Sequence, residues 1–307
     1  MPISLSKYLT DFTLNNKRKG LQPSSIKTYI SHINYFIAYL GDTDDLSAEQ
    51  IESYCSHITN SSLSVNSMHS YLRDVRIFVH YIDEQLGTAY ADSVVLPRTH
   101  QKLVHIFTPD EIQRIYSALL TTRDRLIFAL AYDCGLRRME ICGLRCNDIS
   151  DRMFKVFGKG QKERYVPYGQ VTRRLISAYL AERHSDSEYL ILTKYQRPFT
   201  VDGLSNWFRK LSAASGFDFS AHDLRHNFAT NYLINQIEQH GSTDLFQLQM
   251  ILGHSDQSVT KIYLHIAQQL LIARNSYSHL DALVSQMVVP IGPEPTRSSQ
   301  FMSYNMM

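Results

Sequence analysis

Apolar residues recur every three to four positions along most of this chain, and that spacing restricts it to a fold built mainly of helices. Residues 1–90 hold four such stripes, the first near residues 4–16. The second follows the turn at Pro23, where Ser24 or Ser25 is the expected N-cap. Four stripes of this kind predict a small helical bundle, and their apolar residues are core positions by default.

Two later helix starts show the capping-box pattern, in which two residues three positions apart exchange hydrogen bonds. One pairs Ser47 with Gln50 and begins the third stripe. The other pairs Thr108 with Glu111, and Pro109 stands at the favoured first helical position. We therefore expect a helix to begin at each place.

The helical period changes once, at residues 153–157 and 164–168, which alternate like two short strands around a turn. A short helix is expected before them, after Gly135. Helices are predicted after them at residues 172–182, 201–212, 222–235, 244–252 and 257–273, with a polar interruption at 236–243. The expected fold class is mainly α with a small β-sheet.

The helical stripes fall into two groups. Residues 1–90 form the first, and residues 91–106, which lose the periodicity, are expected to be an interdomain linker. Residues 107–288 form the second group, an α+β domain. The last stretch, residues 289–307, is rich in proline and polar residues and is expected to be a disordered tail.

Composition excludes several classes of protein. The chain has 307 residues, enough for two domains with cores of their own. No apolar run has transmembrane length and no signal-peptide pattern opens the sequence, so we expect a cytoplasmic protein without a membrane partner. The four cysteines form no CxxC pair. Reduced, buried thiols are therefore expected rather than a disulfide framework or a zinc site.

The net charge of +2 does not indicate a polyanionic partner, but its distribution does. Between Arg137 and Arg174 there are ten Lys or Arg residues against four Asp or Glu residues, a local net charge of +6. Such a stretch is a candidate footprint for nucleic acid. A solvated basic face is the alternative, and charge alone favours it.

The candidate site lies between His222 and Tyr263. On a helix, His222, Arg225 and His226 share one face because they are three and four positions apart. His254 and Tyr263 follow on later segments. Together these side chains suit a site that handles a phosphodiester, although each alone has a plainer explanation, such as a helix-capping histidine or a packed aromatic.

A zinc site is the other interpretation of the two histidines in HxxxH spacing. The residue after His222 is Asp223, whereas the zinc enzymes of this pattern carry glutamate there. Arg225 would also place a fixed positive charge beside the metal. Both features argue against zinc.

Two more candidates lie upstream. Arg137 follows Gly135 at a turn between two predicted helices, and Lys159 stands between two glycines at the tip of the predicted hairpin. Alone, each is explained as a solvated surface residue. The lysine does not belong to a nucleotide-binding P-loop, because no Ser or Thr follows it at a helix start.

In combination these positions resemble the tyrosine recombinase (phage integrase) family. The matching segments occur in the family's order and are residues 134–140, 158–167, 222–230 and 252–263. The N-terminal bundle resembles that family's SAM-like core-binding domain, and the size is similar to that of the Xer-type members. One departure is residues 235–243, a segment that looks several residues longer than in compact members.

The resemblance implies a role for each candidate. Tyr263 would attack the scissile phosphate and form a 3′-phosphotyrosyl intermediate, and Arg137 and Arg225 would bind the charge of the transition state. Lys159 would protonate the leaving 5′-oxygen. His222 would assist proton transfer, and His254 would donate to a phosphate oxygen. The resemblance implies no metal, no ATP and no other cofactor.

The implied partners are double-stranded DNA, three further copies of the chain in a homotetramer on two DNA sites, and accessory DNA-bending proteins. A final apolar stripe at Leu280, Leu283, Val284 and Met287 is expected to form a short helix. In the resembled family such a helix docks into a neighbouring subunit, which we expect here, and packing on its own catalytic domain is the alternative. Integration of a mobile element and resolution of DNA dimers both stay open as the biological role. The alternatives are a nicking-closing enzyme like the type IB topoisomerases and a DNA-binding regulatory protein that does not cut.

Overall fold

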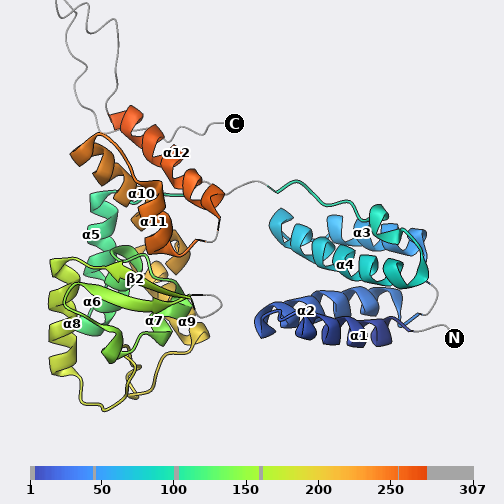
Figure 1. The fold of residues 1–307 in the computed structure, drawn as a ribbon, viewed down its shortest axis with the longest axis horizontal. Helices are drawn as coiled ribbons and strands as arrows, with labels where there is room; N and C mark the ends of the chain where they lie inside the picture. Colours follow the sequence, from blue (N-terminus) through green and yellow to red (C-terminus); the bar gives the residue numbers. More distant parts are fainter. Residues whose placement is uncertain (1–3, 44–45, 100–103, 159–161, 255, 275–307) are drawn as a thin grey trace, which may run out of the picture. The chain divides into compact units, whose positions relative to one another are not determined.

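The computed structural model describes residues 4–43, 46–99, 104–158, 162–254 and 256–274. The chain divides into two compact units, residues 1–103 and 104–307, each with its own hydrophobic core (Figure 1). The fold is mainly helical with one small sheet, as the periodicity predicts. No helix among the described residues is both long and apolar enough to cross a membrane.

The first unit is a bundle of four helices. They are α1 (Leu5–Arg18), α2 (Pro23–Leu40), α3 (Ala48–Thr59) and α4 (Val65–Leu86). The capping box predicted at Ser47 forms, since Ser47 and Gln50 exchange hydrogen bonds of 3.0 and 3.3 Å. The cap predicted for the second helix is wrong. Helix α2 begins at Pro23 itself, whose fixed φ suits the first helical position, so Ser24 and Ser25 lie inside the helix.

The first unit extends past residue 90, into the segment expected to be linker. A 3₁₀ turn, η1 (Tyr90–Ser93), is held by the carboxylate of Asp83 on α4. That carboxylate accepts hydrogen bonds from the backbone N–H groups of Tyr90 at 3.0 Å and Ala91 at 2.8 Å. Ala91 and Val94 are buried in the core of the bundle, so this turn belongs to the packed unit.

The second unit combines a two-stranded antiparallel sheet with a set of helices. Strands β1 (Met153–Phe157) and β2 (Glu163–Pro167) pair from Met153 opposite Pro167 to Phe157 opposite Glu163. The helices are α5 (Pro109–Ser117), α6 (Thr122–Tyr132), α7 (Arg138–Gly143), α8 (Gln170–Glu182), α9 (Val201–Ser215), α10 (Ala221–His240), α11 (Leu245–Leu252) and α12 (Gln257–Arg274), with a 3₁₀ turn η2 (Cys146–Asp148) before β1. Helix α11 packs on strand β2. The predicted capping box of Thr108 and Glu111 begins α5.

Helix α10 is longer than the sequence suggests. The polar interruption predicted at residues 236–243 is present but begins later than predicted, because the helix continues to His240 and ends at Gly241, whose φ is +70°. Glutamine and glutamate are good helix formers, and Ile237 still packs on the cluster that α10 shares with α11 and α12. These three helices lie together in the second unit, coloured orange to red in Figure 1.

Several predictions concern residues outside the described ranges. They are the position of Lys159, the helix at Leu280 to Met287 and the tail at 289–307. The four cysteines are free thiols, with Cys134 and Cys142 buried and the other two partly buried.

The turn between α6 and α7 depends on Gly135, which has a φ of +61°. A Cβ atom there would lie 2.4 Å from Cδ1 of Phe228. We predict that Gly135→Ala lowers the free energy of unfolding by roughly 2–5 kcal/mol, because about 1–2 kcal/mol of left-handed strain adds to about 1–3 kcal/mol of overpacking. Thermal denaturation measures the loss. Gly143→Ala is the control, since its Cβ would meet nothing within 4 Å. Equal stability of the two variants would contradict the prediction.

Candidate active site

The C-terminal end of helix α11 collects three arginines from three different elements. Nε of Arg164, on β2, donates to the carbonyl of Ile251 at 2.7 Å. The carbonyl of Leu252 accepts from Arg225 of α10 at 2.6 Å and from Arg137, at the start of α7, at 3.0 Å. A helix C-terminus offers unpaired carbonyls and a negative partial charge, which is why cations gather there.

Glu140 on α7 supplies the negative charge between these arginines. Its two carboxylate oxygens each accept from Arg164 at 2.7 Å. They also accept from the Arg137 side chain at 3.0 Å and its backbone N–H at 2.7 Å. Burial alone would raise the pKa of Glu140, but the hydrogen bonds and charge of Arg164, followed by Arg137, hold that pKa below its usual value. Glu140 is therefore an anion in the folded protein.

The two arginines predicted for the site differ in access. The Arg225 side chain is 1% exposed, and it also donates to the carbonyl of Gly135 at 2.5 Å. Burial and then the charge of Arg137 lower the pKa of Arg225 to about 9, so it remains cationic at neutral pH. The Arg137 side chain is 38% exposed. Arg137 is thus the more accessible of the two for an incoming phosphate.

His254 is held between Arg225 and α12. Its Nε2 lies 3.2 Å from Nη2 of Arg225, and its Nδ1 lies 3.1 Å from the hydroxyl of Thr260. Because a guanidinium only donates, Nε2 accepts in this contact, and Nδ1 of the neutral ring carries the proton. Burial, followed by the charge of Arg225, lowers the pKa of His254 to about 4, so the ring is neutral at pH 7.

Tyr263 lies on α12 at the edge of this cluster and is 2% exposed. Its ring stacks against that of His254, with centroids 6.1 Å apart. The ring of His226 lies 5.3 Å away on a tilted plane. Burial raises the pKa of the Tyr263 phenol, while the charges of Arg225 and Arg137 act in the opposite direction. The phenol is therefore protonated and sheltered in this state.

The two histidines of α10 contact each other, with ring centroids 4.1 Å apart. Burial, and then the neighbouring Arg225, lower the pKa of His222. Burial and then His222 lower the pKa of His226 to about 4. The Nδ1 atom of His226 is buried without a hydrogen-bond partner among the described residues. The ring of His226 thus neighbours both His222 and Tyr263.

The structure brings together most of the residues predicted from sequence. Arg137, Arg225 and His254 share one hydrogen-bonded cluster, with Tyr263 beside it and His222 one ring further away. Lys159 lies outside the described residues. The hairpin that carries it is closed by a bond of 2.9 Å from the N–H of Gly158 to the carbonyl of Lys162.

Two residues of the cluster were not singled out from the sequence. Arg164 lies in the matching segment 158–167. No local sequence pattern predicts its contact with Glu140, because the two residues are 24 positions apart. Thr260 is buried on α12, three residues before Tyr263, where a helical face suggests proximity only once the site is known.

Part of the basic stretch is paired within the second unit. Lys155 contacts Glu163 at 2.8 Å and Arg173 contacts Asp151 at 2.6 Å. Arg145 contacts Glu188 at 3.0 Å. These exposed pairs contribute little stability and stay available to exchange partners. A polyanion footprint along this stretch stays a prediction.

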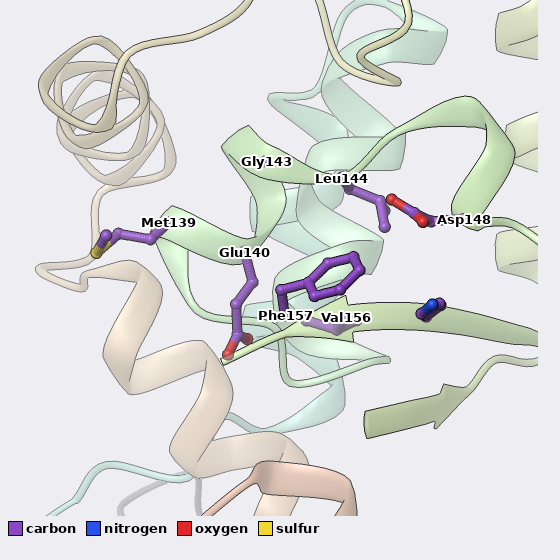
Figure 2. A pocket seen from close by; sticks show the side chains of 8 residues that line it. Met139, Glu140, Gly143, Leu144, Asp148, Val156 and Phe157 are labelled. Carbon is purple, nitrogen blue, oxygen red and sulfur yellow. The ribbon is translucent and has the colours of Figure 1, made fainter. Parts of the chain in front are cut away.

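A small cavity lies beside the cluster, between α7 and β1. Figure 2 shows Glu140 projecting from α7 next to Val156 and Phe157, while Met139 points to the other side. The cavity has a volume of about 50 Å³, which holds water but is too small for a substrate. Within the described ranges, no group of three or more His, Cys, Asp or Glu side chains could hold a metal ion. The exposed edge of Arg137, 38% accessible, is where the arginine cluster meets solvent.

Comparisons with known proteins identify the family of the chain. Residues 105–269 match the model of the phage integrase family, and residues 8–88 match the phage integrase N-terminal SAM-like domain. Tyrosine recombinase XerD of Listeria innocua serovar 6a is 27% identical over 81% of this chain and 90% of its own length. Tyrosine recombinase XerA of Thermococcus onnurineus is 31% identical over 82% and 88%.

The fold is similar to that of lambda integrase, solved as a tetramer bound to a Holliday junction. That structure has a TM-score of 0.68 and 18% identity, and the match covers 83% of this chain and 78% of the other. The chain belongs to the phage integrase family, so it is a tyrosine recombinase.

We predict that the protein loses stability as the pH falls from about 6.5 to 4. His226 and His254 have folded pKa values of about 4, whereas an unfolded histidine titrates near 6.5. In that window the unfolded chain binds more protons, so acid favours unfolding. The melting temperature should be lower at pH 5 than at pH 7.5. His226→Phe should shrink the difference, whereas His265→Gln, at an exposed position of α12, should leave it unchanged. A pH-independent melting temperature would refute the assignment.

Proposed function

We propose that this chain cuts and rejoins DNA strands at specific sites through a 3′-phosphotyrosyl intermediate on Tyr263. One observation carries the proposal. Two arginines and a histidine share one hydrogen-bonded cluster, and a tyrosine ring stacks on that histidine. Such a cluster provides fixed positive charge where a phosphodiester gains negative charge, with a nucleophile next to it.

In the proposed step, the phenol oxygen of Tyr263 forms a bond to the scissile phosphorus, and the bond from phosphorus to the 5′-oxygen breaks. The phenol proton leaves as the bond forms, and the 5′-oxygen gains a proton as it departs. Arg137 and Arg225 stabilise the extra charge on the non-bridging oxygens through forked, permanently cationic donors. Rejoining is the same exchange in reverse, with a different 5′-hydroxyl.

Proton transfer is assigned to three residues. Lys159 is the acid for the leaving oxygen, and His222 accepts the proton from the nucleophile's side. His254 donates to a phosphate oxygen. For that role Nε2 must gain a proton, since in the DNA-free arrangement it accepts from Arg225. The sheltered phenol of Tyr263 must also move or be uncovered when DNA binds.

The intermediate conserves the energy of the broken phosphodiester as a phosphotyrosyl ester. Strand exchange by this route consumes no ATP and needs no metal, because arginines take the place of a Lewis acid. We further propose that four copies act on two DNA sites, with accessory DNA-bending proteins where the sites require them. The tetrameric assembly of lambda integrase, whose fold this chain shares, supports that arrangement.

Two alternatives predict different products. A nicking-closing enzyme relaxes supercoiled plasmid without exchanging strands between molecules, whereas a recombinase joins two site-bearing DNAs. A regulatory protein that does not cut forms no covalent adduct. Sequencing the DNA trapped covalently on the protein identifies the site, and incubation of two labelled site-bearing fragments distinguishes exchange from relaxation.

We predict that Tyr263→Phe abolishes covalent attachment to a nicked suicide DNA while leaving DNA affinity nearly intact. The change removes the nucleophilic oxygen and keeps the buried ring. Denaturing gels measure the adduct, and gel shifts measure binding. The control is Tyr232→Phe, since the Tyr232 hydroxyl bonds Gln247 on α11 at 2.6 Å. A covalent band that persists in Tyr263→Phe would assign the nucleophile to another tyrosine, such as Tyr232 or Tyr277.

We predict that Lys159→Ala slows cleavage by about 10²–10⁴-fold, the usual contribution of a general acid, with little change in binding. A 5′-bridging phosphorothiolate should restore most of the rate, because sulfur leaves without a proton. Lys162→Ala, in the same hairpin, is the control and should cleave both substrates normally. If Lys159→Ala cleaves the oxygen and sulfur substrates equally slowly, Lys159 contacts the phosphate but is not the general acid.

A further inference from the structure

Arg164 has no role in the proposed chemistry, yet it is one of the most completely bonded side chains of the cluster. It is 9% exposed, and all three guanidinium nitrogens donate within 2.7 Å. Two of them reach the two oxygens of Glu140, and the third reaches the carbonyl of Ile251. The Arg164 side chain also crowds the turn after α11, because a Cβ on Gly253 would lie 3.0 Å from its Cδ and 3.3 Å from its Nε.

The forked contact fixes the plane of the Glu140 carboxylate. A guanidinium that meets both oxygens leaves the carboxylate one orientation, which a lysine ammonium cannot do. Glu140 then presents one oxygen to the side chain of Arg137 and the other to its backbone N–H. The orientation of Arg137 is thus set by a partner that Arg164 itself orients.

Charge gives Arg164 a second effect. Glu140 carries one negative charge, and Arg164 contacts it more closely than Arg137 does, 2.7 against 3.0 Å. With Arg164 present, Glu140 is neutralised and the charge of Arg137 is left over for a phosphate. Without Arg164, the buried carboxylate would have Arg137 as its closest cation, and it would compete with the phosphate for that guanidinium.

We infer that Arg164 is a positioning residue for strand cleavage, which orients and neutralises Glu140 so that Arg137 remains directed at the scissile phosphate. The inference rests on the proposed function. It names a residue that does not touch DNA and acts through Glu140.

The test is a double-mutant cycle on Arg164→Met and Glu140→Gln, read as the single-turnover rate of covalent adduct on suicide DNA. Arg164→Met should slow the reaction by on the order of 10- to 100-fold, the loss seen when a residue that orients a metal ligand is removed from a metal site. Glu140→Gln keeps the shape but removes the competing charge, so the double variant should react faster than Arg164→Met alone. A purely structural arginine would show no such rescue, because a second change would only add damage.

Arg183→Met is the matched control. Arg183 also donates to backbone carbonyls of the second unit, those of Tyr189 at 2.6 Å and Leu190 at 2.9 Å, but outside the cluster. That variant should lower the melting temperature without slowing adduct formation by the folded protein. Arg164→Lys, which keeps the charge and loses the fork, covers the case in which Arg164→Met does not fold, and it should show a smaller defect of the same kind.

The outcomes distinguish failure of the proposed function from failure of the inference about Arg164. If the wild-type protein forms no adduct, the proposed function fails. If the wild type reacts and Arg164→Met and Arg164→Lys both react at its rate, the inference is overturned. It is equally overturned if the double variant is as slow as Arg164→Met.

Discussion

Three guanidinium groups bonded to the carbonyls at the end of α11 are the interaction on which the second unit's site depends. They fasten α7, β2 and α10 to one point, through Arg137, Arg164 and Arg225. Burying the guanidinium groups of Arg164 and Arg225 is costly unless each finds acceptors, and a helix C-terminus with Glu140 supplies them. The same contacts that satisfy the helix end therefore set the geometry of the site.

The arginine cluster carries more positive than negative charge. Three arginines face one carboxylate, so the cluster keeps a surplus of positive charge even after Glu140 is neutralised. Burial, followed by this surplus charge, disfavours protonation of His254 and lowers its pKa to about 4. The surplus charge favours binding of an anion, and the exposed edge of Arg137 is the accessible place for the phosphate of the proposed function.

Local sequence patterns predicted most helices and both strands. Long-range contacts determine the helix ends and site contacts that were not predicted. Helical spacing and the capping boxes at Ser47 and Thr108 could be read directly, because both ends of each interaction lie within four residues. The continuation of α10 to His240 could not, since it depends on packing against α11 and α12. For the site, Arg137, Arg225 and His254 were predicted through a family resemblance. Arg164 was missed because its partners, Glu140 and Ile251, are 24 and 87 positions away.

Three side chains assigned to the proposed chemistry have partners within the protein. The phenol of Tyr263 is buried with a raised pKa, His254 has its acceptor nitrogen toward Arg225, and Arg137 bonds the carbonyls of Leu252 and Gly253. Each group is satisfied by a partner that a bound phosphate would have to replace. A phosphate that accepts from Arg137 and Arg225 would draw them from the end of α11, on which α12 and its tyrosine also pack. If Tyr263 is the nucleophile, as proposed, binding of the substrate and exposure of its phenol would be coupled through one helix end.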